Sequence, residues 1–512
     1  MDNPSINNWS NLPRNIIYNI GSYTYKYFLP NLRLINKHWL SAINPIFFYS
    51  ISDFDDDKVD YIVSKYLGLI GMLDSFDSRN LETMNKIIEQ AKCIDEIRWW
   101  AGEEPYLDRL LDLLKARKGI KSITLIDDDE HDIEYKGKIK WNNLIDVLKD
   151  YSSFESFRIN IRCTYLIPMF NSLPLFVIKN LDLKIGCNQV ESSIKIILKC
   201  DNLRRLKLEI KDGDSLSNDI DLLSLINLSK LIGTNLEYFH LLVYEHKSID
   251  LEIFKKRLNM ELFDTFSNPN FSKLKCFDFD FICRDPLYFR SIFTEPLTSI
   301  ASQWTNLTKM CLFSIDEFLL GHIIYHCPNL RILTFKSPLV MPYNHYSSSL
   351  KPLKYLTRML FGGFHSDILD HKEFIRKIFP SVTTLSLCEL YSKPDDVELK
   401  AYYIPNLFPD LIKVIFDSTE YNLDELIDSW HEYLTWEELY IVPDKSNEKS
   451  LRSLLPKLTK LRNLYVSDIQ IDPYRLRDLN FDSVNFKVFI AYLNENTVFD
   501  FKIEDEVPLT CV

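Results

Sequence analysis

Residues 305–335 read TNLTKMCLFSIDEFLLGHIIYHCPNLRILTF, and this stretch decides the fold. The pattern apolar-x-x-apolar-x-apolar occurs twice in it, starting at Leu307 and at Leu330. Between the two copies, Phe318-Leu319 and Ile323-Ile324 have the spacing of one face of a helix. The stretch therefore predicts a short strand, a turn and a helix, followed by the next strand.

The same hexad recurs along most of the chain, at intervals of 23 to 38 residues. Its copies start at Ile94, Ile120, Phe154, Ile178, Leu203, Leu236, Leu274, Leu307, Leu330, Leu356, Val382, Leu411, Trp436 and Leu461. After Leu274 the steps are 33, 23, 26, 26, 29, 25 and 25 residues. A hexad with a period of roughly 20 to 29 residues is typical of a leucine-rich-repeat solenoid.

In such a solenoid the three apolar residues of each hexad point inward and the residues between them face outward on a parallel sheet. We therefore expect an α/β chain whose residues 94–492 form a helix-backed solenoid of about 14 irregular repeats with a curved sheet. The predicted central outward residues are Arg98, Thr124, Arg158, Asp182, Lys207, His240, Asp278, Cys311, Thr334, Leu360, Ser386, Ile415, Tyr440 and Tyr465. A solenoid of this kind favours a macromolecular binding function over catalysis.

Composition narrows the class of partner. The net charge of -12 and the pI near 5.4 argue against a general nucleic-acid binder. None of the ten cysteines forms a C-x-x-C pair, and the chain begins without a basic-then-apolar leader. Together these two features favour reduced thiols, and hence a protein of the cytoplasm or nucleus. The longest charge-free stretch, residues 163–178, contains two prolines and is too short to span a bilayer, so no membrane partner is expected.

The sequence carries little that predicts chemistry. His322 and His326 are four residues apart on an expected helix, with Cys327 next to them, and could form half of a metal site. No further ligand stands nearby, so we interpret them as ordinary helix histidines. Glycine-rich phosphate loops and nucleophile elbows are absent from the sequence. We therefore expect no catalytic residue, no metal and no cofactor.

The first fifty residues do not follow the repeat. A short helix is predicted to begin at Leu12-Pro13, because proline suits the first turn of a helix. Gly21 is predicted to end this helix. A second helix is expected from Pro30 to Trp39, and a third apolar piece over residues 43–48. Three helices in about forty residues make a marginal fold, so a partner or the solenoid is expected to stabilise them.

Two runs in this segment, LPRNIIYNI at 12–20 and LRLINKHW at 32–39, resemble an F-box. An F-box followed by leucine-rich repeats is similar in order to the F-box/LRR protein family. The resemblance implies docking on the Skp-type adaptor of a cullin-based SCF ubiquitin ligase, with the repeats holding a protein substrate for ubiquitin-dependent degradation. The residues expected to bind the adaptor are Leu12, Pro13, Ile17, Ile20, Leu32, Ile35 and Trp39. Arg14-Asn15 replaces the usual acidic residue, which implies weaker adaptor binding.

The sequence thus predicts four parts: an F-box-like helical domain (10–49), a helical linker and cap (50–93), the solenoid (94–492) and an acidic tail (493–512). The leading hypothesis is a non-catalytic substrate-recognition subunit of an SCF-type ubiquitin ligase. The alternative is a structural F-box/LRR interaction protein, for example in a kinetochore-like assembly, that does not drive degradation. Because tyrosine and arginine are common interface anchors, the candidate substrate-binding residues are Ile415, Tyr440, Tyr465, Arg158, Arg205 and Lys207.

Overall fold

A computed structural model represents the whole chain. It describes residues 12–22, 33, 37–47, 65–66, 70, 72–74, 94–100, 104–116, 119–126, 143–144, 146–149, 155–160, 177–186, 193, 196–197, 199–211, 235–244, 273–282, 294, 297–298, 301–302, 304–341, 350–365, 367–388, 397–398, 403–417, 435–441, 460–467 and 487–491. These residues fall into two compact units, unit 1 up to Leu203 and unit 2 from Arg204 onward. The tail 493–512 lies outside the described residues.

Two helices in unit 1, α1 (Arg14–Ser22) and α3 (Lys37–Phe47), pack against each other. Two hydrogen bonds join them: the ring Nε2 of His38 lies 2.8 Å from the Leu12 carbonyl oxygen, and Arg14 donates to the Ser41 carbonyl oxygen at 3.0 Å. Their shared core contains Ile17, Trp39, Ala42 and Ile43, with Leu12 packed against it.

The predicted division of this segment was partly wrong. Trp39 and Ile43 lie four residues apart on the single helix α3, whereas the sequence reasoning put them on two helices. Residues this far apart project to one face of a helix, so both can reach the same core. The described part of 10–49 therefore shows two helices together with the single helical residue Arg33.

The parallel sheet of unit 1 has five described strands, joined in chain order. The strands are β1 (Met72–Asp74), β2 (Glu96–Trp100), β3 (Ser122–Ile126), β4 (Ser156–Asn160) and β5 (Asn180–Gly186). Helix α6 (Glu104–Ala116) connects β2 to β3. β1 adds a strand to the segment 50–93, which the sequence predicted to be helical.

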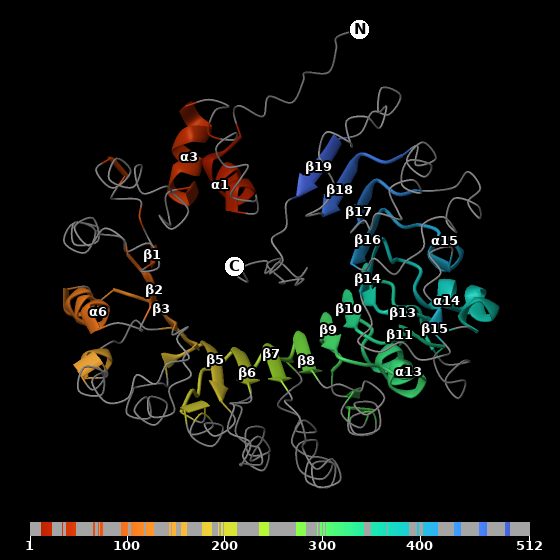
Figure 1. Cartoon of the computed structure of the whole chain (residues 1–512), viewed down its shortest axis with the longest axis horizontal. Coiled ribbons are helices and arrows are strands. Elements are labelled where there is room, and N and C mark those ends of the chain that lie inside the picture. Colours follow the sequence, from red (N-terminus) through yellow and green to blue (C-terminus); the bar gives the residue numbers. More distant parts are fainter. Residues whose placement is uncertain are drawn as a thin grey trace. The chain divides into compact units, whose positions relative to one another are not determined.

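Eleven described strands form the parallel sheet of unit 2, and each follows its predecessor side by side (Figure 1). They are β6 (Arg205–Lys211), β7 (Tyr238–Tyr244), β8 (Cys276–Ile282), β9 (Lys309–Leu312), β10 (Ile332–Phe335), β12 (Arg358–Phe361), β14 (Thr384–Cys388), β16 (Lys413–Asp417), β17 (Glu438–Ile441), β18 (Asn463–Ser467) and β19 (Lys487–Ala491). Parallel strands with a helix between them are the arrangement that the repeat predicted.

The hexads position the strands. All fourteen predicted copies have a strand that begins two residues after the first apolar residue, as β9 does after Leu307 and β10 after Leu330. The hexad residues whose side chains the structure describes are buried, and Leu307, Met310 and Leu312 have no exposed surface. Within each unit, each hexad therefore supplies one layer of the core.

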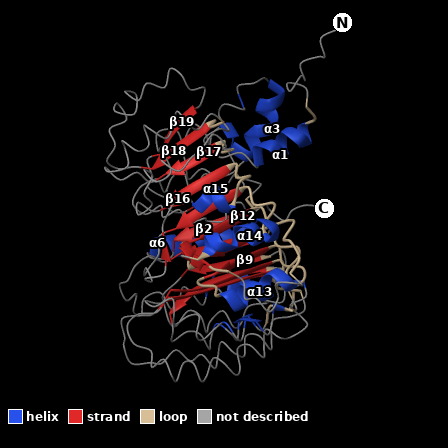
Figure 2. Cartoon of the chain, turned by 90° about the vertical axis from the view of Figure 1, so that its right-hand side faces the viewer, coloured by secondary structure: helices blue, strands red, loops and turns tan. Residues whose placement is uncertain are grey.

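Helices cover one side of the unit 2 sheet. α13 (Glu317–His326), α14 (Lys372–Ile378) and α15 (Tyr403–Leu407) lie on the same side of the strands (Figure 1, Figure 2). The side chain of Asp316 caps α13 by accepting a 2.8 Å hydrogen bond from the Leu319 amide. Of the predicted apolar face of α13, Leu319, Ile323 and Ile324 are buried, whereas Phe318 is 40% exposed and Leu320 is buried instead. The opposite side of the sheet, on which no helix of the described residues lies, is called the helix-free face below.

A backbone ladder in the turns extends the strand pairing by one residue. The amide of Thr308 donates to the Lys275 carbonyl oxygen at 2.8 Å, and the Arg331 amide donates to the Thr308 carbonyl oxygen at 2.7 Å. The Thr308 hydroxyl also donates to the Lys275 carbonyl oxygen, at 3.0 Å. Asn329, from the recurring Asn-Leu pair, donates its amide to the Thr305 carbonyl oxygen at 2.8 Å. These bonds fix the register between neighbouring repeats.

A small second sheet was not predicted. It consists of β11 (Pro338–Leu339), β13 (Gly363–His365) and β15 (Val397–Glu398), and a 3-10 helix, η9 (Ile368–His371), follows β13. Segments of two or three residues are too short to show a periodic pattern. None of the helices that the structure describes is both long and apolar enough to cross a bilayer.

Candidate functional site

The predicted outward residues form one row on each sheet. In unit 1, Arg98, Thr124, Arg158 and Asp182 are register partners in turn. In unit 2, the row consists of Lys207, His240, Asp278, Cys311, Thr334, Leu360, Ser386, Ile415, Tyr440 and Tyr465. This register was predictable because side chains alternate along a strand and every hexad enters its strand at the same position.

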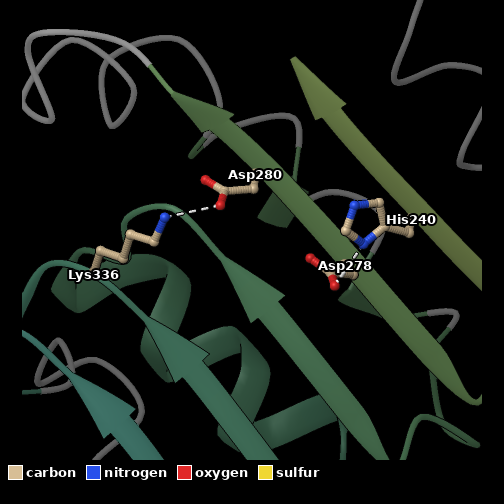
Figure 3. A network of polar contacts seen from close by, with 4 residues as sticks. All are labelled: His240, Asp278, Asp280 and Lys336. Atoms are coloured by element: carbon tan, nitrogen blue, oxygen red, sulfur yellow. Dashed lines mark hydrogen bonds and ion pairs between the residues drawn. The ribbon is translucent and has the colours of Figure 1, made fainter. Parts of the chain in front are cut away.

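A polar network lies near the start of the unit 2 row, on β7 and β8 (Figure 3). Asp278 is 3% exposed, and its Oδ2 atom lies 2.7 Å from Nδ1 of His240. Burial alone would raise the pKa of Asp278. The hydrogen bond from His240, the charges of His240 and Lys309, and a hydrogen bond from the Cys311 thiol outweigh this burial and lower the pKa. Asp278 is therefore a buried carboxylate that stays ionised.

Asp280 lies two residues further along β8 and has a different environment. Its Oδ2 atom accepts a 3.0 Å hydrogen bond from the Lys336 ammonium, which follows β10 (Figure 3). Burial raises the pKa of Asp280, and the nearby Lys336 charge opposes this effect without cancelling it. The two carboxylates of one strand thus have pKa values displaced in opposite directions.

Three buried polar atoms of this cluster have no hydrogen-bond partner in the described structure. They are Nε2 of His240, Oδ1 of Asp280 and Nζ of Lys309. Buried polar groups in folded proteins almost always have partners, so unpaired ones often mark a place where a ligand or water binds. Because Oδ1 of Asp280 accepts and Nζ of Lys309 donates, the cluster can form hydrogen bonds of either polarity.

The cluster has no activated nucleophile. Burial and the charges of Asp278 and Asp280 raise the pKa of the Cys311 thiol well above its usual value, so it is a poor nucleophile. On α13 the rings of His322 and His326 stack 5.7 Å apart, and burial lowers the pKa of both. Among the described residues, no group of three histidine, cysteine or carboxylate side chains is arranged to hold a metal ion.

Two of the early candidate substrate residues, Arg158 and Arg205, already have partners within the chain. The Nε atom of Arg158 lies 2.7 Å from the Asp182 carboxylate across β4 and β5. The guanidinium of Arg205 lies over the Tyr238 ring, 4.4 Å from its centroid. Lys207 occupies the next position on the same face of β6. Arginine residues held in this way are pre-oriented for a further contact.

The late candidate residues differ in accessibility. Ile415 is 3% exposed and offers little surface to a partner, because it is packed within the row. Tyr440 is half-buried, and Nζ of Lys413 lies 4.4 Å from its ring centroid and 3.3 Å from its hydroxyl oxygen. Tyr465 occupies the next register position on β18, and its side chain lies outside the described residues.

The predicted adaptor residues are divided between core and surface. Ile17 and Trp39 are buried in the α1–α3 core, Leu12 packs against that core, and Pro13 is exposed. Ile20 is part of α1, but its side chain lies outside the described residues. Leu32 and Ile35 also lie outside the described residues.

Sequence reasoning missed the apolar residues that α1 and α3 leave exposed. Ile16 is 42% exposed and Leu40 is 36% exposed. Tyr18, two residues after Ile16 on α1, is also exposed. The run of isoleucines at positions 16 and 17 contained the signal, since adjacent residues on a helix cannot both face the same core. We call Ile16, Tyr18 and Leu40 the exposed apolar set.

No known protein-family model matches the chain, and no curated protein matches it in sequence. Among solved structures, it is similar to a chain of the crystal structure of the Rad7 and Elc1 complex in yeast. The TM-score is 0.44 and the sequence identity is 11%, over 78% of this chain and 91% of that chain. The neighbour is thus a distant one, with a chain of comparable extent.

Proposed function

We propose that this protein is a non-catalytic recognition subunit of an SCF-type ubiquitin ligase. Helices α1 and α3 bind a Skp-type adaptor that links the chain to a cullin, and the helix-free face of unit 2 binds a protein target for ubiquitin-dependent degradation. The resemblance of 12–20 and 32–39 to an F-box suggests the adaptor. The compartment that fits this function is the cytoplasm or the nucleus.

The exposed apolar set is the observation that carries the proposal. The described core between α1 and α3 consists of four buried residues with Leu12 packed against them, which is little for an element of this size. The same two helices nevertheless leave Ile16, Tyr18 and Leu40 exposed. Apolar surface on a small helical element is characteristic of a binding site for another protein.

The proposal divides the predicted adaptor residues into two roles. Ile17 and Trp39 hold α1 against α3, so they position the surface without contacting the adaptor. Ile16 and Leu40 supply the contact. Burying the exposed 42% and 36% of these side chains would contribute about 1 to 2.4 kcal/mol together, which corresponds to about 6- to 60-fold in affinity.

The test uses the full-length chain as bait in a eukaryotic lysate, with the adaptor and the cullin identified by immunoblotting. The variant Ile16→Ser/Leu40→Ser leaves the α1–α3 core intact, whereas Leu12→Ala would disturb it. The matched control is Ile412→Ser, because Ile412 is 43% exposed but lies before β16 in unit 2. Circular dichroism of each purified variant checks that it is folded.

We expect the wild type and Ile412→Ser to retrieve the adaptor and the cullin, and the double variant to lose most of both. Equal retrieval by the folded double variant would exclude α1 and α3 as the docking surface. Retrieval of the adaptor without a cullin would instead support the structural-assembly alternative. If the wild type retrieves neither protein, the ligase proposal is wrong.

A further inference from the structure

The unpaired polar atoms of unit 2 are concentrated at one place on the helix-free face. Of the six buried side-chain nitrogen and oxygen atoms that have no hydrogen-bond partner among the described residues, three belong to His240, Asp280 and Lys309. His240 and Asp278 are register partners on β7 and β8, and Asp280 lies two residues further along β8. Lys309, the first residue of β9, lies two residues before Cys311, which is the register partner of Asp278. Because side chains two residues apart share a face of a strand, these residues lie together, and we call His240, Asp278, Asp280 and Lys309 the polar cluster.

Lys309 contributes an unused hydrogen-bond donor to the polar cluster. The residue is 8% exposed, and its Nζ atom has no hydrogen-bond partner among the described residues. The nearby carboxylate of Asp278 balances the ammonium charge without accepting a hydrogen bond from it. Burying an N–H group without an acceptor is costly, so this position favours a ligand that carries an acceptor.

Asp280 and His240 contribute two unused acceptors. Oδ2 of Asp280 binds Lys336 at 3.0 Å, which leaves Oδ1 without a partner among the described residues (Figure 3). Nδ1 of His240 lies 2.7 Å from Oδ2 of Asp278, and an ionised carboxylate can only accept, so Nδ1 carries the proton. In the neutral ring Nε2 is then an acceptor, and it has no partner among the described residues either. The side chains of His240 and Asp280 are 14% and 16% exposed, so a projecting group can reach them.

The formal charges around the polar cluster cancel when His240 is neutral. The charge of Lys309 balances that of Asp278. Lys336 balances Asp280, with 3.0 Å between the ammonium and the carboxylate. A further carboxylate, phosphate or ammonium group would therefore be a buried charge without a counter-ion, which is costly. The ligand that suits the cluster is a polar group with no net charge.

A carboxamide matches the unused atoms in number and polarity. The side chain of asparagine or glutamine has two N–H donors, one carbonyl acceptor and no charge. The two N–H groups suit Nε2 of His240 and Oδ1 of Asp280, and the carbonyl oxygen suits Nζ of Lys309. A backbone amide has only one N–H, and a serine or threonine hydroxyl has only one O–H, so neither matches all three atoms.

We propose that the polar cluster recognises an asparagine or glutamine side chain of the protein target, which donates to His240 and Asp280 and accepts from Lys309. This inference rests on the proposed role of unit 2 in binding a protein target and specifies one residue that the target presents. A target with another side chain at this place would leave the three polar atoms buried and unpaired, and that cost makes such a site selective.

The test selects binders from a displayed library of random nonapeptides on the purified full-length chain, without the adaptor. The same selection is made on Asp280→Asn, which replaces the charged acceptor, and on Lys309→Met, which removes the donor. The control variant Asp370→Asn/Lys372→Met makes the same chemical changes at exposed positions of η9 and α14. Circular dichroism checks that each variant is folded. The strongest peptide is then synthesised with its carboxamide residue and with the corresponding acid, and fluorescence anisotropy measures the affinity of both for each protein.

We expect the wild type and the control to enrich asparagine or glutamine at one fixed position of the peptides, and the two cluster variants to lose this enrichment. Asp280→Asn should weaken binding of the carboxamide peptide by about 10- to 160-fold, as expected for the loss of a hydrogen bond to a charged group. The acid peptide should bind the wild type more weakly than the carboxamide peptide, and this comparison does not depend on the folding of a variant.

Three results would overturn the inference. They are equal or tighter binding of the acid peptide to the wild type, a carboxamide preference that survives both cluster substitutions, and a selection on the wild type without a fixed carboxamide position. None of these results depends on whether the adaptor binds α1 and α3, so a failure here is distinct from a failure of the ligase proposal.

Discussion

The substitution Asp278→Asn is expected to destabilise unit 2 strongly at neutral pH. The Asp278 carboxylate is 3% exposed and accepts the His240 Nδ1 hydrogen bond at 2.7 Å. Its negative charge also interacts with the buried ammonium of Lys309, which has no hydrogen-bond partner among the described residues. Asparagine preserves the size of the side chain and one acceptor oxygen, so the change removes the charge with little effect on packing.

The magnitude follows from the loss of that charge. A hydrogen bond to a buried charged group is worth about 1.5 to 3 kcal/mol. Leaving Lys309 buried without a countercharge adds to this loss, because breaking a buried pair costs about 3 to 5 kcal/mol when the remaining charge is fully desolvated. Lys309 retains some exposure, so we expect the free energy of unfolding to fall by about 2 to 4 kcal/mol at pH 7.

The effect should depend on pH in a definite direction. The pKa of Asp278 is lowered in the folded chain, so its stabilising contribution is complete above the unfolded pKa of about 3.9. It is lost as the pH falls through the lower folded pKa. Because asparagine does not titrate, the difference between wild type and variant should close in acid.

Urea denaturation of both proteins, followed by circular dichroism between pH 3 and pH 7, measures this difference. Asp410→Asn is the control, because Asp410 is exposed in the turn before β16 and should change stability by less than about 0.5 kcal/mol. The reasoning is refuted if Asp278→Asn unfolds at the same urea concentration as wild type at pH 7. A difference that stays constant down to pH 3 would also refute it.

Three further predictions concern other buried groups. Burial raises the pKa of Asp280, so the ionised carboxylate opposes folding at neutral pH. Asp280→Asn should therefore be at least as stable as wild type at pH 7, and the difference in stability should shrink as the pH falls through the raised pKa. Thermal unfolding of both proteins across this pH range measures the difference. Cys200 and Cys327 have pKa values raised to about 12, so mass spectrometry should find both unmodified after iodoacetamide treatment of the native chain and both modified in urea. Ile17→Ala should unfold α1 and α3 at a lower temperature than wild type, since it removes about 2 to 5 kcal/mol of core packing, and limited proteolysis of this segment should detect the change.

The strand positions could be predicted because a hexad is a local pattern. The two strands of the long parallel sheets that the hexad missed, β1 and β19, show the limit of this signal. β1 follows the buried Ile70, but Ser75 occupies the third apolar position of that hexad. β19 follows a hexad in which Asn485 occupies the first position. Terminal repeats need not stack on both sides, so their pattern is weaker than that of internal repeats.

The candidate sites were predictable to a smaller degree. The sequence indicated that residues 12–20 form an apolar helix, but it did not separate Ile17, which is buried, from Ile16, which is exposed. That distinction depends on the angle at which α1 packs on α3. Ile415 was predicted to face a partner and is buried at the expected register position, because outward position and accessibility are different properties.

By itself, the sequence determined which residues share a face of the sheet, because the alternation of side chains along a strand depends only on local geometry. It did not determine that His240 contacts Asp278 or that Lys336 contacts Asp280, because these pairs are 38 and 56 residues apart in the chain. Tertiary structure decided these contacts, because it places these distant positions on adjacent strands (β7 and β8) or on β8 and directly after β10, with one strand between them, where buried charges interact strongly.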